Sequence, residues 1–176
     1  GTHSMRHATE PRPALVVAHG QPSAPAGPEA DLALFATALA AAAGGRRVLS
    51  ATLAAPGALE SALAETGPAP VVWPLFMADG WFTGTLLPRR LAEAGATQPL
   101  ICAPFGLDPA LPALIAGRAC EAAARSGHAP GETAVLLAAH GSPSNPRPRA
   151  VAEAVARAVA AEGGFRAVRT GFVDEA

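Results

Sequence analysis

The feature that most constrains the fold of this chain is an internal repeat. Segment 15–25, Leu-Val-Val-Ala-His-Gly-Gln-Pro-Ser-Ala-Pro, aligns with segment 136–146, Leu-Leu-Ala-Ala-His-Gly-Ser-Pro-Ser-Asn-Pro. Both copies keep the pattern His-Gly-x-Pro-Ser-x-Pro, and their histidines, His19 and His140, lie 121 residues apart. Self-similarity at a domain-sized spacing indicates two related structural units. Each unit is expected to begin with a buried apolar strand that ends at a histidine.

Apolar runs and helix-length segments alternate along the chain. Strands that alternate with helices predict an α/β fold, with parallel sheets flanked by helices. In such sheets ligands bind at the carboxyl ends of the strands, where both histidines are expected. The expected strands lie near residues 14–18, 47–53, 71–76, 99–102, 135–139 and 167–173.

Two segments between the expected strands are predicted to differ in structure. The first, after His19, is expected to be a helix because Leu32, Phe35 and Leu39 recur at helical spacing and would face the sheet. The second, residues 77–84, shows no such spacing and is expected to be a loop.

The repeat also sets the expected domain limits. Residues 1–12 are expected to be a tag remnant and an N-terminal tail, with Met5 as the native start. Residues 13–128 are expected to form the first unit and residues 133–176 the start of a second, truncated one. The linker between them is rich in Gly, Ser and Pro.

The composition is that of a globular chain and gives no sign of a highly charged binding partner. Half of the residues are apolar, 15% are charged, and the net charge is −1. These values give no argument for nucleic acid or for an anionic membrane. No apolar run approaches the roughly 20 residues of a membrane span, and no signal peptide precedes the first strand. We therefore expect a cytoplasmic protein with neither a membrane nor a nucleic-acid partner.

The two repeated histidines are the first candidates for catalytic residues. A neutral imidazole at a strand end can bind a metal ion of intermediate softness or act as a base near neutral pH. A histidine that only bonds within its loop would explain one such residue. Two at equivalent positions, His140 and His19, favour a functional role.

Five segments resemble the class II tetrapyrrole chelatases, which include sirohydrochlorin cobaltochelatases of the CbiX type and ferrochelatases. The His-Gly motif of the first strand is the most specific of them. The segments are Val-Ala-His-Gly at 17–20, Ala-Ala-His-Gly-Ser-Pro at 138–143, Pro-Leu-Phe at 74–76 with Gly80 and Pro88, residues 103–109, and residues 171–175.

The resemblance implies ATP-independent insertion of a divalent metal into a tetrapyrrole such as sirohydrochlorin. Cobalt is the expected metal, with nickel or iron as alternatives, and the metal is a substrate rather than a resident cofactor. The other partner is the tetrapyrrole, and the chain is compatible with a homodimer. By the same resemblance His140 is a metal ligand, and Asp174 or Glu175 supplies a carboxylate.

A tetrapyrrole rimmed with carboxylates needs cationic contacts. All 13 basic residues of the chain are arginines, whose forked guanidinium suits carboxylates. Arg147 and Arg149 follow the His140 loop, and Arg89 begins a helix, so these three are the expected substrate-binding arginines. A solvated charge on a helix surface is the alternative reading for each of them.

The sequence departs from the family pattern in its first half. Phe82 stands where the family has a second metal-binding histidine, and Leu86 stands where it has an aspartate. The first half therefore keeps His19 but lacks the polar partners that a metal needs. A non-catalytic tetrapyrrole- or metal-binding relative is accordingly the alternative function. A serine hydrolase of the α/β type is disfavoured, because the chain has no Gly-x-Ser-x-Gly.

Overall fold

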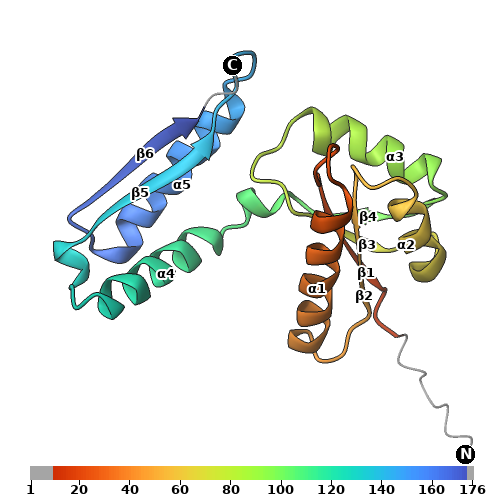
Figure 1. The fold of residues 1–176 in the computed structure, drawn as a ribbon, viewed down its shortest axis with the longest axis horizontal. Coiled ribbons are helices and arrows are strands. Elements are labelled where there is room, and N and C mark those ends of the chain that lie inside the picture. The colour runs from red at the N-terminus through yellow and green to blue at the C-terminus, as the bar shows by residue number, and fades with distance from the viewer. Residues whose placement is uncertain (1–9, 174–176) are drawn as a thin grey trace, which may run out of the picture. The chain divides into compact units, whose positions relative to one another are not determined.

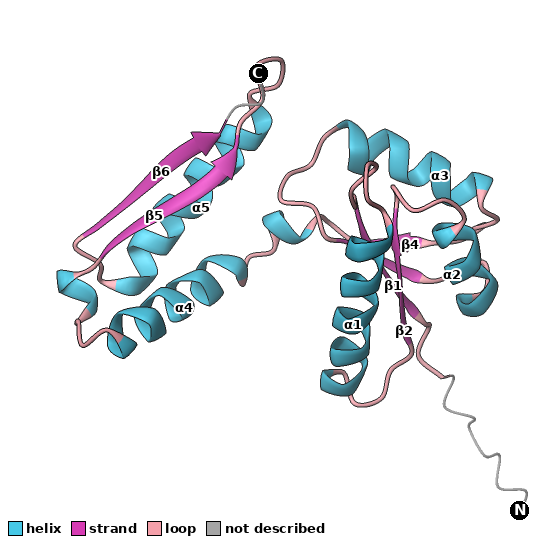
Figure 2. Ribbon diagram, in the orientation of Figure 1, coloured by secondary structure: helices cyan, strands magenta, loops and turns pink. Residues whose placement is uncertain are grey.

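The computed structural model describes residues 10–173. It is an α/β protein with two parallel sheets flanked by helices, which confirms the fold class expected from the sequence (Figures 1 and 2). The described chain divides into two compact units. One contains residues 10–74 and 88–102, and the other contains residues 75–87 and 103–173. No helix among the described residues has the length and apolarity needed to cross a membrane.

The first unit holds a four-stranded sheet in the order β2-β1-β3-β4, with every neighbouring pair parallel. Four of the expected strands therefore share one sheet, as predicted. The strands are β1 (Ala14–Ala18), β2 (Val48–Thr52), β3 (Val71–Pro74) and β4 (Leu100–Ile101), and the connecting helices are α1 (Ala26–Ala42), α2 (Ala58–Thr66) and α3 (Leu87–Glu93).

The core of this unit is centred on β1. Leu15, Val16 and Val17 are all at most 1% exposed, so both faces of β1 are covered, as the uninterrupted apolar run indicates. On α1, Leu32 is buried as expected, but Phe35 is 41% exposed. Ala36 is buried on α1 instead, one full turn after Leu32. The expectation for Phe35 was therefore wrong.

The segment between β3 and α3 is more regular than the sequence indicates. Residues Phe82–Leu86 form one turn of π-helix that runs directly into α3, where a loop was expected up to residue 84. Pro88 explains the wide turn, because it has no N–H to donate to the carbonyl of Gly84. Short π-helical turns of this kind are frequent at functional sites.

The second unit holds a two-stranded parallel sheet made of β5 (Ala134–His140) and β6 (Ala167–Val173). This confirms the second predicted sheet. Helix α5 (Arg147–Gly163) packs against both strands and also against α4 (Leu111–Arg125), as Figure 2 shows. Val159 of α5 is fully buried in this layer.

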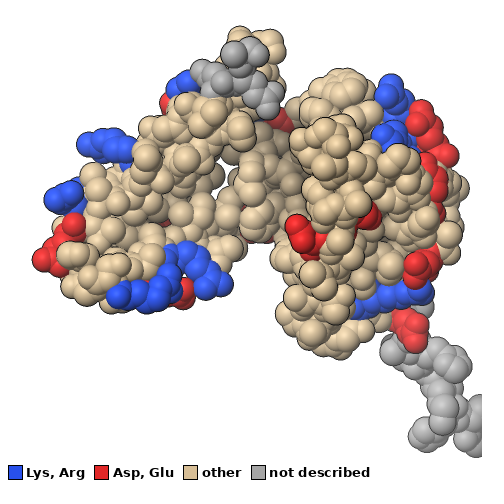
Figure 3. All heavy atoms as spheres, in the orientation of Figure 1, with Lys and Arg blue, Asp and Glu red and all other residues tan. Residues whose placement is uncertain are grey.

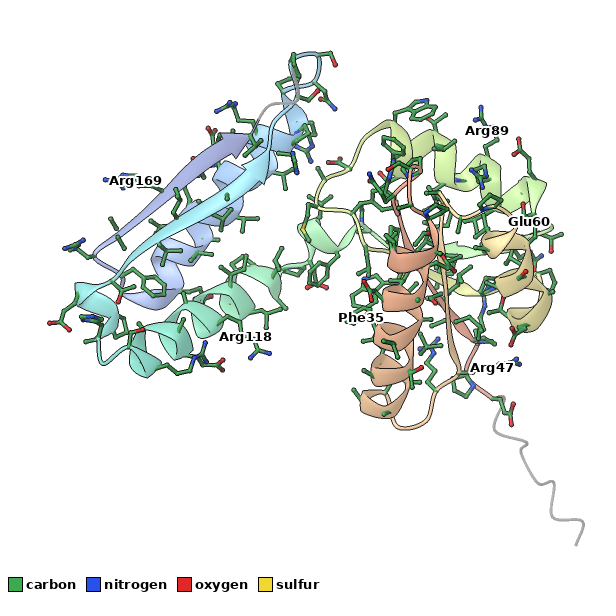
Figure 4. The ribbon with its side chains drawn as sticks, viewed as in Figure 1. Phe35, Arg47, Glu60, Arg89, Arg118 and Arg169 are labelled. Atoms are coloured by element: carbon green, nitrogen blue, oxygen red, sulfur yellow. The ribbon has the colours of Figure 1, made fainter. Side chains whose placement is uncertain are left out.

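One face of the β5–β6 sheet is exposed within residues 10–173. Leu136 is 70% exposed and Val173 is 61% exposed. Leu136 pairs with Arg169, which points away from the sheet (Figure 4). The expectation that β5 is a buried strand was therefore wrong for this face. Its continuous apolar run is typical of a strand covered on both faces, whereas α5 covers one.

The loop after β1 depends on Gly20. Its φ is +79°, and a Cβ there would lie 2.7 Å from the Cβ of Thr52, a buried residue of β2. We expect Gly20→Ala to lower the free energy of unfolding by about 2–4 kcal/mol, from left-handed strain plus steric overlap. Denaturant unfolding followed by circular dichroism measures this.

The matched control is Gly45→Ala. Gly45 has a similar φ of +83°, but nothing lies within 4 Å of its Cβ position. This variant should lose only the conformational part, about 1–2 kcal/mol. An equal loss of unfolding free energy in the two variants would show that the steric overlap with Thr52 does not add to the cost.

Candidate functional site

His140 is the last residue of β5 and lies at the carboxyl end of the sheet. It pairs with Val173 of β6, and the N–H of Gly141 donates to the Val173 carbonyl at 3.1 Å. The ladder thus continues one residue past the histidine and holds its backbone in place. The side chain of His140 is exposed. This is the position that the strand-end motif predicts.

A cavity of about 490 Å³ opens beside His140. Its walls come from β5, from α4 and α5, and from the loop after β3, which contributes Met77 and Ala78. His140 is the one titratable side chain among the lining residues, and the rest are apolar or glycine. A concave, mostly apolar site with one polar group is typical of small-molecule binding. An imidazole there keeps a nitrogen lone pair for a metal or a proton.

The carboxylates expected beside His140, Asp174 and Glu175, lie outside the described residues. The register is informative, however, because Val173 directly precedes Asp174 in the sequence and pairs with His140. Within residues 10–173 no three His, Cys, Asp or Glu side chains lie close enough together to hold a metal. The ligand role of Asp174 and Glu175 stays a prediction.

Arg147, the first residue of α5, forms an ion pair with Asp79. Its Nε lies 2.6 Å from Oδ1 and its Nη2 lies 3.2 Å from Oδ2, which is the two-pronged geometry typical of arginine and carboxylate. The hydrogen bond to the Arg147 guanidinium holds the pKa of Asp79 below its usual value, and the same bond raises the pKa of Arg147. Sequence reasoning named Arg147 but missed its partner.

Asp79 had a signal in the sequence. It is the single charged residue between Val71 and Pro88, in a segment otherwise made of apolar and small residues. A lone charge in such a segment is a candidate for a specific partner.

The other two expected arginines lie in different surroundings. The guanidinium of Arg149 lies 3.8 Å from the centre of the Phe172 ring, which places it on the α5 side of β6. Arg89 points from α3 toward solvent and pairs with Glu93 one turn later, at 3.7 Å (Figure 4). Their roles in substrate binding stay predictions.

Aromatic residues fill the place of the missing family histidine. Phe82 stacks on Phe76 with ring centres 6.2 Å apart and meets Trp81 edge-on at 5.2 Å. Trp81 is 56% exposed and Phe82 is 39% exposed. The loop after β3 thus presents flat apolar rings to solvent where the resemblance implies a metal ligand.

The start of this loop is held by the short helix Phe105–Leu107 (η2). The N–H of Gly106 donates to the Phe76 carbonyl at 2.9 Å, and any Cβ on Gly106 would overlap the backbone of Met77. Only glycine permits this approach, which explains part of the motif at residues 103–109.

His19, the equivalent residue of the first unit, is also exposed just after its strand. Its Nδ1 lies 3.1 Å from the carbonyl oxygen of Gly20. The neighbouring strand end is ordered by Glu29 of α1, whose carboxylate accepts the N–H of Thr52 at 2.7 Å. Both repeated histidines therefore lie at the carboxyl end of a parallel sheet, each in its own unit.

Charged side chains are scattered over the surface. On the face shown in Figure 3, acidic and basic groups are interspersed and most of the area is neither. The exposed arginines of α4 and β6, Arg118 and Arg169, lie on separate elements (Figure 4). The ion pair of Arg147 is therefore not part of a large charged patch on the face that Figure 3 shows.

No family model and no curated protein matches this chain. Eight chains of solved structures match it, and CbiX and SirB are two of them. CbiX, described as the terminal enzyme for biosynthesis of siroheme in denitrifying bacteria, is 42% identical with a TM-score of 0.82, over 94% of this chain and 70% of that one. SirB from Bacillus subtilis with Fe3+ is 19% identical with a TM-score of 0.68, over 91% and 64% of the two chains.

The chain belongs to the class II tetrapyrrole chelatase superfamily. Within that superfamily it is a CbiX-like member. The match to SirB shows the same fold at lower identity.

The ion pair of Asp79 and Arg147 should make the stability of the protein depend on pH. Because Arg147 lowers the pKa of Asp79, the pair stabilises the folded protein above the ordinary aspartate pKa, and this contribution is lost as the pH falls through the lowered value. Carboxyl NMR should show a lower Asp79 midpoint in the native protein than in Arg147→Gln. Arg149→Gln, the control, should leave the Asp79 midpoint where it is, and an identical shift in both variants would contradict the pairing.

The close contact of Gly106 with the loop should make this position sensitive to substitution. Gly106→Ala should lower the free energy of unfolding by about 1–3 kcal/mol, because the backbone of Met77 must move. The control is Gly117→Ala in the middle of α4, where nothing lies within 4 Å of the added Cβ. Alanine there should raise the free energy of unfolding by about 0.5–1 kcal/mol, because it is the better helix former. Thermal unfolding of both variants decides this. A neutral Gly106→Ala would mean that the loop is not packed on η2.

Proposed function

We propose that this protein inserts a divalent metal into sirohydrochlorin without ATP, and that the metal is ferrous iron. The observation that carries the proposal is His140, a histidine at a strand end that lines an apolar cavity in a CbiX-like chain. Insertion requires groups that hold a metal by exchangeable bonds and that accept the two pyrrole protons. An imidazole that acts together with carboxylates meets both requirements.

The choice of iron over cobalt rests on the 42% identical relative. That protein is described as an enzyme of siroheme biosynthesis, and siroheme is an iron tetrapyrrole. Imidazole and carboxylate ligands accept iron, cobalt and nickel alike, so the donor set by itself does not select among them. Cobalt and nickel are therefore tested beside iron.

In the proposed reaction His140 has two linked roles. Its ring nitrogen binds the incoming metal. As the metal passes to the macrocycle nitrogens, the vacated imidazole nitrogen accepts one of the two pyrrole protons, and the carboxylate of Asp174 or Glu175 accepts the other. Asp174 and Glu175 follow the β6 residue that pairs with His140, and we assign the carboxylate ligands to them. We assign contacts with the carboxylates of the macrocycle to Arg147, Arg149 and Arg89.

His140→Ala tests the proposal. Mixing sirohydrochlorin with Fe²⁺, Co²⁺ or Ni²⁺ and following the macrocycle absorbance measures insertion. The variant should lose about 10²-fold or more of the enzyme-dependent rate, the usual contribution of a positioned acid–base group. Its thermal midpoint should stay close to that of the wild type, because the side chain is exposed and packs little core.

Two further histidine variants serve as controls. His128→Ala removes an exposed histidine from the linker after α4 and should leave the insertion rate unchanged. His19→Ala should reduce it less than His140→Ala does, because Phe82 and Leu86 replace its expected partners. Full activity in His140→Ala would overturn the assignment. A wild-type protein that binds sirohydrochlorin but never metallates it would instead support the non-catalytic alternative.

A further inference from the structure

The ion pair of Asp79 and Arg147 has a role beyond packing. Among the ion pairs of residues 10–173 it joins the segments that lie farthest apart in the sequence, 68 residues. Asp79 lies on the loop after β3, and Arg147 begins the helix that follows the His140 loop. The pair therefore ties two segments that both border the His140 cavity, through Ala78 on one side and Pro148 on the other.

The end of α5 that carries Arg147 favours a carboxylate for two reasons. The guanidinium offers a planar fork, and the first turn of a 17-residue helix carries partial positive charge. The N–H of Arg147 is already taken by the Oδ1 of Asn145 at 3.0 Å, so the side-chain fork is the group left to bind an acid. Asp79 occupies the Nε–Nη2 edge of that fork, with Oδ1 on Nε and Oδ2 on Nη2.

The pair is also easy to exchange. The side chains of Arg147 and Asp79 are 50% and 45% exposed, and ion pairs in contact with water contribute little net stability because both ions stay hydrated. A carboxylate from a ligand makes the same two bonds to the fork. Exchange of one carboxylate for the other therefore costs little free energy, and it leaves Asp79 to be solvated by water.

We propose that Asp79 occupies the Arg147 fork in place of a substrate carboxylate, and that binding of the polycarboxylate macrocycle displaces it and releases the loop. The inference rests on the proposed function, because it needs a substrate rimmed with carboxylates. Gly106 still holds the loop at Phe76, so the release is confined to the residues around Asp79. Those residues include Trp81, whose exposed ring is then able to approach the flat face of the macrocycle.

Asp79→Asn tests the exchange, because it keeps the shape of the side chain and removes its charge. Titration of metal-free sirohydrochlorin should give a dissociation constant about three- to tenfold lower than in the wild type, because less competition remains for Arg147. A simple structural clamp predicts the opposite, a weaker complex from a disordered loop. The thermal midpoint of the variant is measured alongside, to show that it folds.

A double-variant cycle isolates the pair. Arg147→Gln should weaken binding, and in that background Asp79→Asn should no longer tighten it, because the two residues act through one fork. The matched control is Glu121→Gln, which breaks the exposed pair of Arg118 and Glu121 in α4 and should leave binding unchanged. Hydrogen exchange of residues 78–84 should become faster when sirohydrochlorin is bound.

The outcomes separate this proposal from the proposed function. If the wild type binds and metallates sirohydrochlorin while Asp79→Asn binds it equally or more weakly, the exchange is wrong and the function stands. If Asp79→Asn still tightens binding in the Arg147→Gln background, Asp79 acts elsewhere and the exchange is also wrong. If the wild type neither binds nor metallates sirohydrochlorin, both proposals fall.

Discussion

In each unit, backbone hydrogen bonds between parallel strands bring the strand carboxyl ends to one edge of a sheet. Parallel pairing requires a crossover after each strand, so the residues that follow the strands become loops at that edge. His19 follows β1 and His140 is the last residue of β5, so both lie at the carboxyl edge of a parallel sheet, the edge where such sheets bind ligands. For His140 the pairing is specific to the residue, because it opposes Val173 and the ladder continues to Gly141. The chemistry proposed for this protein depends on that register.

The loop after β3 supplies what the strand ends lack. It brings a wall of the His140 cavity, a carboxylate on Arg147, and a group of exposed rings. Two contacts hold it within its own unit, the Gly106 hydrogen bond to Phe76 and the Asp79 ion pair. One is a steric fit that only glycine allows, and the other is an exposed charge pair. The first is difficult to undo and the second is easy, so the loop is anchored at one point and adjustable at the other.

The replacement of family residues has a consistent physical meaning in this chain. Phe82 and Leu86 take the places of a histidine and an aspartate, and Phe82 joins a stack with Phe76 and Trp81. A segment that holds a metal in the family thus presents apolar rings here. This agrees with a site in which His140 carries the metal chemistry and the loop contacts the macrocycle.

Much of this protein was determined by its sequence alone. The repeated motif and the alternation of apolar runs predicted six parallel strands in two sheets and placed both histidines at strand ends, because these patterns reflect local backbone geometry. The sequence did not reveal the π-helical turn, the exposure of Phe35, the exposed face of β5 or the partner of Arg147. The last three depend on which segments meet in space, and Asp79 and Arg147 meet across 68 residues of chain. Tertiary packing alone brings such residues together, because no local pattern encodes a distant partner.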